Sequence, residues 1–157
     1  MITHAVEPWI EAPLARFVDD SRATIALLLL PSGQVLAQHG FFRAVDVSSA
    51  CALAAAIHAS GRELGKMLDG GPFTVMHHAG RERELFLAEA RTPRGSYILL
   101  TVFDRESSLG LVRIYFDEFV ANLTAAAPGS QAVAGPVLAQ NFEQDLNRNL
   151  AALFGRG

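Results

Sequence analysis

Apolar and polar residues along the chain follow helical and strand-like periods in turn. Leu14, Phe17 and Val18 recur at helical spacing and predict a helix over residues 13–21. The run "ATIALLLL" is apolar at every position, and "PSG" joins it to "QVLAQHG". This arrangement predicts a β-hairpin whose first strand is covered on both faces of a sheet.

The second half of the domain predicts a long helix, three strands and a further helix. Asp46 or Ser48 can cap the long helix, and Gly70-Gly71-Pro72 ends it. The strand-like runs are "PFTVMHHAG", "RELFLAEAR" and "SYILLTVFD", and a helix that Ser107 or Ser108 can cap follows them. We therefore expect an α+β fold, with a five-stranded antiparallel sheet between helices in the order α-β-β-α-β-β-β-α.

The composition changes near the C-terminus. The segment "APGSQAVAGP" has the composition of a linker, so we expect a domain over residues 1–126, a linker over 127–136 and a C-terminal helix over 137–157. One stripe of that helix is apolar and contains Phe142, Leu146, Leu150 and Leu153. The helix could cap the domain or act as an arm that binds a groove on a partner.

Charge and targeting signals exclude several classes of protein. The net charge is −3, and no run of Lys and Arg suggests a nucleic-acid surface. No signal peptide or membrane-spanning run is visible, and the single cysteine, Cys51, cannot form an internal disulfide. We expect a cytoplasmic protein that neither binds nucleic acid nor inserts into a membrane.

The sequence offers no positive sign of catalysis. Cys51 could be a nucleophile, but no partner residue is placed by the sequence, and a structural cysteine is the alternative. His77 and His78 are neighbours on a predicted strand, so they point to opposite faces and cannot share one metal ion. No nucleotide-binding or hydrolase motif occurs. We expect no enzyme activity, no cofactor and no metal site.

The alanine-rich helix "SACALAAAIHASGRELGKM" raises the question of what its small side chains meet. At about 100° per residue it divides into three faces. The face expected to pack on the sheet contains Leu53, Ile57, Ser60, Leu64, Met67 and Leu68. A face suited to the close approach of another helix contains Ala50, Ala54, Gly61 and Gly65. The outer face, which we interpret as a docking surface, contains Cys51, Ala55, His58, Ala59, Arg62 and Lys66. The alternative is that alanine is simply a good helix former.

Several stretches resemble the Roadblock / dynein light chain domain. They are "ALLLLPSGQVLAQHG", "LAAAIHASGRELGKML" and "ELFLAEARTPRGSYILLTVFDRESSLGLVRIYF", and together the likeness covers roughly residues 13–125. The added linker and "FEQDLNRNLAALF" are similar to the C-terminal segment of the bacterial MglB proteins.

The resemblance implies a homodimeric regulator in cell polarity or motility that stimulates GTP hydrolysis by a small Ras-like GTPase of the MglA type. The family pairs an edge strand, here residues 73–79, and the middle helix across a two-fold axis, without an inserted arginine finger. The implied dimer residues are Ala50, Ala54, Gly61, Gly65, Val75 and His77. The implied GTPase-binding residues are Ala55, His58, Ala59, Arg62 and Lys66, with tail contacts from Phe142, Leu146, Leu150 and Leu153. The alternative is a scaffold subunit that binds GTPases or sibling subunits without affecting hydrolysis.

Overall fold

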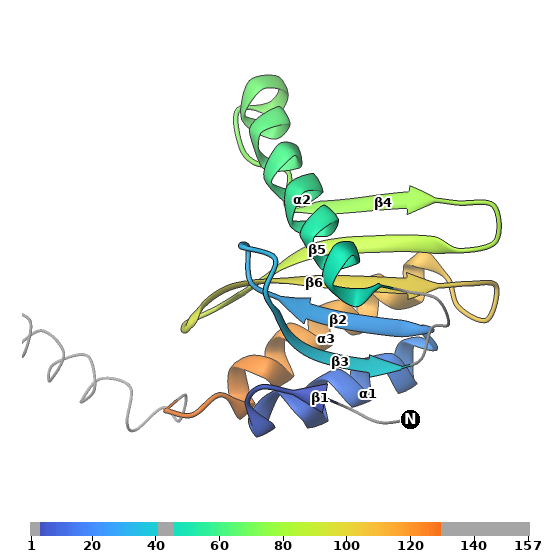
Figure 1. Cartoon of the computed structure of the whole chain (residues 1–157), viewed down its shortest axis with the longest axis vertical. Helices are drawn as coiled ribbons and strands as arrows, with labels where there is room; N and C mark the ends of the chain where they lie inside the picture. The colour runs from blue at the N-terminus through green and yellow to red at the C-terminus, as the bar shows by residue number, and fades with distance from the viewer. Residues whose placement is uncertain (1–3, 41–45, 130–157) are drawn as a thin grey trace, which may run out of the picture.

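The computed structural model describes residues 4–40 and 46–129 and contains one sheet with helices on both faces (Figure 1). The helices are η1 (Pro8–Ile10), α1 (Glu11–Ser21), α2 (Val47–Asp69) and α3 (Leu109–Ala126). The strands are β1 (His4–Ala5), β2 (Ile25–Leu29), β3 (Val35–Gly40), β4 (Val75–Ala79), β5 (Glu84–Thr92) and β6 (Gly95–Phe103).

The predicted α+β fold is confirmed, with one small addition. The strand order is β1-β3-β2-β6-β5-β4, and all neighbours are antiparallel. The five predicted strands are β2 to β6. The sixth, β1, has two residues and pairs with β3 through His4 and Gln38. A two-residue strand is too short to show a period of its own, so the sequence pattern did not predict it.

The sheet separates two apolar clusters. On one face, Ala26 and Leu28 of β2 pack with residues of α1 and α3. On the other face, Leu27 and Leu29 lie in a cluster with the first half of α2. All five residues of β2 are buried, which confirms a central strand covered on both sides. In Figure 1, α2 crosses the strands and extends beyond β4, so its C-terminal end lies past the edge of the sheet.

Local signals set the ends of the elements. Gly33 has φ +95° in the turn between β2 and β3, a conformation that favours glycine. The Asp46 carboxylate accepts a hydrogen bond from the Ser49 N–H and caps α2, and Gly70 ends that helix with φ +74°. Ser108 caps α3 by accepting from the Leu111 N–H. Helix α1 begins at Glu11, two residues before the prediction, because η1 leads directly into it.

The predicted C-terminal helix and most of the predicted linker lie outside the described residues. Those residues end at Gly129, and the domain boundaries stay predictions. No helix within residues 4–40 and 46–129 combines the length and apolar character needed to cross a bilayer.

Candidate functional site

The face of α2 that meets the sheet consists of small residues and one histidine. Its buried positions are Cys51, Ala54, Ala55, His58, Gly61 and Gly65. The large apolar residues point away from the sheet: Met67 is 79% exposed, Leu68 74%, Leu53 65% and Leu64 48%. The prediction that these leucines, Met67 and Ser60 pack on the sheet is therefore wrong, because all of them are exposed. Ile57 alone of the predicted set is half-buried and packs against the apolar cluster beneath the helix. Periodicity identified the apolar face but could not tell whether it covers the sheet or faces outward.

The chain's own loops and strands explain why the buried face is small. A Cβ on Gly33, in the hairpin turn, would lie 3.4 Å from the Ala52 Cα and 3.6 Å from the Ala55 Cβ. At the other side of the helix, a Cβ on Gly61 would lie 2.7 Å from the Met76 Sδ of β4. A Cβ on Gly65 would collide with the backbone of Phe73 and Gly71. The glycines therefore admit parts of the same chain, whereas the sequence had suggested a twin helix.

This placement corrects three of the residues assigned to the dimer interface. Ala54, Gly61 and Gly65 are buried on the side of α2 that meets the sheet, and Ala50 is half-buried. Val75 and His77 lie on β4, the last strand of the sheet in the described structure, and both are exposed. The His77 Nε2 lies 2.8 Å from the Glu84 Oε1, and its ring stacks on Phe103 with centroids 6.3 Å apart.

An apolar ridge runs along the outside of α2 on the side of β4. We use this name for a set that lies within roughly 100° around the helix: the exposed residues Leu53, Leu64, Met67 and Leu68, and the half-buried Ile57, which also packs against the cluster beneath the helix. The same count places the ridge next to Gly61, which approaches β4 through Met76. Phe73 and Val75, 37% and 39% exposed, add apolar side chains near the sheet edge. Val75 lies on the face opposite α2, because its partner Ala88 belongs to the cluster with α1 and α3. Exposed apolar residues gathered in this way indicate an interaction surface.

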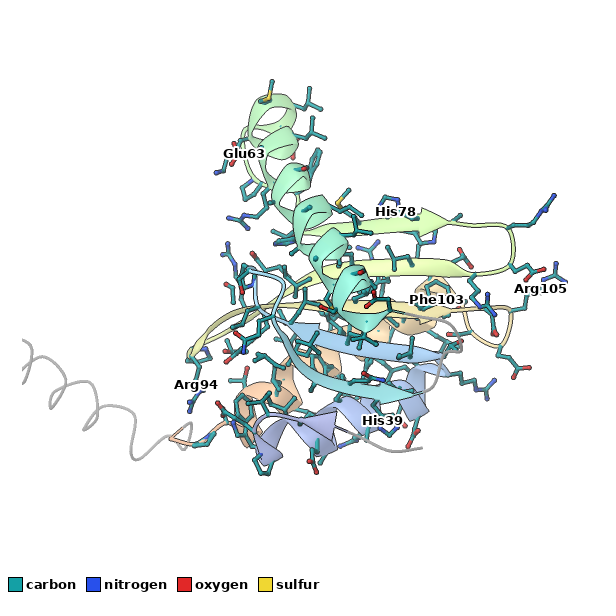
Figure 2. The ribbon with its side chains drawn as sticks, in the orientation of Figure 1. His39, Glu63, His78, Arg94, Phe103 and Arg105 are labelled. Carbon is teal, nitrogen blue, oxygen red and sulfur yellow. The ribbon has the colours of Figure 1, made fainter. Side chains whose placement is uncertain are left out.

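A second exposed strip lies on the side of α2 that faces the hairpin. We call Ala52, Ala56, Ala59, Glu63 and Lys66 the alanine strip; all five are exposed. Ala52 places it beside the Gly33 turn. Its charged end contains a Lys66–Glu63 ion pair of 3.1 Å. Figure 2 shows Glu63 on the part of α2 that extends past the strand bearing His78.

A buried carboxylate beneath α2 was not predicted from the sequence. The Glu89 side chain of β5 is 6% exposed. The Arg62 Nη1 donates to its Oε1 at 2.8 Å, and the Arg91 Nε donates to its Oε2 at 2.9 Å. The His58 Nε2 lies 3.4 Å from Oε1. We call these four residues the Glu89 network. The available signal was a charge at an inward-facing strand position, which requires a partner.

The pKa of Glu89 reflects two opposing effects. Burial disfavours the carboxylate and by itself raises the pKa. The hydrogen bond from Arg91, the charges of Arg62 and Arg91, and the hydrogen bond with His58 outweigh it, so the pKa lies below its usual value. The network therefore holds an ionised carboxylate under the helix.

The five residues predicted to bind a GTPase are not equivalent in the structure. Ala55 and His58 are buried, with 7% and 4% of their surface exposed. Arg62 is held by Glu89. Ala59 and Lys66 are exposed on the alanine strip. Phe142, Leu146, Leu150 and Leu153 lie outside the described residues.

Other candidate chemistry is limited. Cys51 is buried, and burial raises the pKa of its thiol, so the thiol stays protonated at neutral pH. Within the part of the chain that the structure describes, no three His, Cys, Asp or Glu side chains come together as a possible metal site.

A family model and two solved structures of known proteins resemble this chain in sequence and fold. The model of the Roadblock/LC7 domain matches residues 10–104. The solved structure of Myxococcus xanthus MglB is 26% identical and has a TM-score of 0.68, over 76% of this chain and 95% of that one. The gliding protein MglB from Thermus thermophilus is 25% identical with a TM-score of 0.66, over 76% of this chain and 88% of that one.

A further likeness extends to the fold alone. The Roadblock/LC7 domain from Streptomyces avermitilis is 23% identical with a TM-score of 0.61, over 71% of this chain and 91% of that one. The curated proteins contain no match to this sequence.

Proposed function

The chain belongs to the Roadblock/LC7 family, and on that premise we propose that it is a homodimeric regulator of a small Ras-like GTPase of the MglA type. The regulator binds the GTPase and stimulates its GTP hydrolysis in the cytoplasm. The likeness to two MglB structures at 25–26% identity supports this choice within the family. The observation on which the proposal mainly rests is that α2 presents two different exposed surfaces.

The apolar ridge is suited to a second copy of the chain. It lies on the β4 side of α2, and β4 has a strand neighbour on one side only within the described structure. A two-fold axis can pair β4 with β4 and ridge with ridge, because an isologous interface uses the same patch on both copies. The dimer assignment therefore moves from Ala54, Gly61 and Gly65 to the ridge, and retains Ala50, Val75 and His77.

The alanine strip is suited to the GTPase. It lies on the other side of α2 from β4, so it stays accessible when the ridges pair. Its alanines permit close approach of a partner's loops, and Lys66 and Glu63 supply charge at one end. Of the residues proposed to bind a GTPase, Ala59 and Lys66 can make direct contact, and Arg62 acts through Glu89. The tail residues Phe142, Leu146, Leu150 and Leu153 remain proposed additional contacts.

The regulator would work by positioning groups that belong to the GTPase. Hydrolysis requires the GTPase's own residues to orient the attacking water and to stabilise charge on the transferred phosphoryl group. A protein that binds the ordered switch loops more tightly than the mobile ones shifts their population toward the active arrangement. No arginine of this chain needs to enter the active site under this mechanism.

The experiment compares Ala59→Arg with Ala121→Arg. Ala59 lies on the alanine strip, and Ala121 is an exposed alanine of α3 on the opposite face of the sheet. Ala59→Arg should remain dimeric and lose binding to the GTP-bound GTPase, while Ala121→Arg should bind like the wild type. If Ala59→Arg stays dimeric and still stimulates hydrolysis, the docking assignment is wrong.

The alternative in this family is a scaffold that binds without affecting hydrolysis. A dimer that binds the GTPase through the alanine strip and leaves its rate of hydrolysis unchanged would support the scaffold. Binding and hydrolysis must therefore be measured on the same preparations.

A further inference from the structure

The second half of α2 has little apolar surface directed at the sheet. From His58 onward its inward positions are His58, Gly61, Arg62 and Gly65, and the larger apolar residues face outward. Met76 fills the space above Gly61. Apolar contact is non-directional, so a face of this kind does little to fix the angle or the register of a helix.

The Glu89 network supplies directed contacts at that place. His58 and Arg62 are four residues apart on α2 and reach the same carboxylate oxygen, at 3.4 and 2.8 Å. Glu89 is anchored in turn, because its N–H donates to the Thr74 carbonyl at 2.9 Å, next to the last β4–β5 pair. Charge-assisted hydrogen bonds are short and depend strongly on geometry, so they define one position of the helix.

We propose that Glu89 is a positioning residue, which fixes α2 over the sheet edge and thereby sets the apolar ridge and the alanine strip in their binding positions. The inference rests on the proposed function for its biological consequence. Glu89 itself touches no partner, because its side chain is 6% exposed. Arg62 acts through Glu89 and is likewise a positioning residue.

The test compares variants that alter the Glu89 network on the helix with variants that alter it on the sheet. Arg62→Met and Arg91→Met each remove one arginine from Glu89, but Arg62 lies on α2 and Arg91 on β5, the strand of Glu89 itself. Glu89→Gln preserves the shape of the side chain and removes its charge. Ile98→Ala serves as a control for stability, because Ile98 is buried, pairs with Glu89 in the sheet and belongs to the apolar cluster below α2.

The direct readout is the position of α2 within one chain. Spin labels at Asp69→Cys, on the last residue of α2, and Ile114→Cys, on the exposed side of α3, report this distance in a Cys51→Ala background. Dilution with unlabelled protein removes distances between copies. We expect the distance distribution to broaden or shift in Glu89→Gln and Arg62→Met, and to stay unchanged in Arg91→Met and Ile98→Ala.

The second readout is self-association. Glu89→Gln and Arg62→Met should raise the dimer Kd about tenfold or more, and Arg91→Met and Ile98→Ala by less than about twofold. Unchanged label distances in Glu89→Gln and Arg62→Met, or equal weakening of the dimer by Ile98→Ala at matched loss of stability, would overturn the inference. If Glu89→Gln fails to fold, the comparison of Arg62→Met with Arg91→Met still tests whether the contact with Glu89 positions α2.

The two proposals fail in different ways. A wild-type chain that stays monomeric at high concentration contradicts the proposed dimer, while the label distances within one chain still test Glu89. A dimeric wild type whose helix does not move in Glu89→Gln or Arg62→Met contradicts the inference alone.

Discussion

At the scale of single residues, two glycines of α2 show how the same substitution can have different costs. A glycine in the middle of a helix costs roughly 1 kcal/mol relative to alanine, so both positions carry an intrinsic penalty. The Cβ of an alanine at 65 would meet the backbone of Phe73 and Gly71, which cannot move without displacing the start of β4. The Cβ of an alanine at position 61 would instead meet the sulfur atom of the flexible Met76 side chain.

We therefore predict that Gly65→Ala lowers the free energy of unfolding by about 2 kcal/mol, because overpacking outweighs the gain in helix propensity. Gly61→Ala serves as the matched control and should change it by less than about 1 kcal/mol, since Met76 can adopt another rotamer. Chemical denaturation of both variants provides the measurement. Equal losses of stability would show that the two contacts do not differ as described.

Glu89 also predicts a dependence of stability on pH. Its pKa in the folded chain is lower than the ordinary value of 4.5. The folded state therefore binds fewer protons than the unfolded state near that pH, and the stabilisation is complete above about pH 4.5 and is lost as the pH falls through the folded pKa. The difference in unfolding free energy between wild type and Glu89→Gln should shrink as the pH is lowered below about 4.5. A difference that stays constant from about pH 7 to about pH 3 contradicts this role.

At the scale of elements, the sequence predicted nearly every helix and strand in the described structure. The hairpin at Gly33 and the caps of α2 and α3 have local chemical causes, and local causes are visible in sequence. The orientation of α2 was predicted wrongly, because its ridge is as periodic as a core-facing stripe would be. What the stripe faces depends on Gly33, Met76 and Phe73, which approach the helix from other parts of the chain.

The orientation of α2 leads to a prediction for the ridge. Leu64→Ser with Leu68→Ser should leave the melting temperature of a dilute, monomeric sample nearly unchanged, because both side chains are already 48% and 74% exposed. The same double variant should fail to self-associate in sedimentation velocity runs at concentrations where the wild type is dimeric. A dimer that survives both substitutions would place the interface on another surface.

At the scale of the whole molecule, the fold and the family could be recognised from the sequence. The exposed surfaces of α2 could not be assigned without the structure. Fold recognition depends on the order and spacing of many weak signals over roughly residues 13–125. The surface depends on which side of one helix meets the sheet. The structure replaces a twin-helix contact at Ala54, Gly61 and Gly65 with an exposed ridge on one side of α2 and an alanine strip on the other.

The most direct test is single-turnover GTP hydrolysis by the MglA-type GTPase of the same genome, measured with and without this protein. We predict that a saturating amount of the dimer raises the hydrolysis rate by at least about tenfold, because ordering the switch loops brings the GTPase's own catalytic groups into place. A rate that does not change although the two proteins bind each other would contradict the central claim and identify the chain as a scaffold.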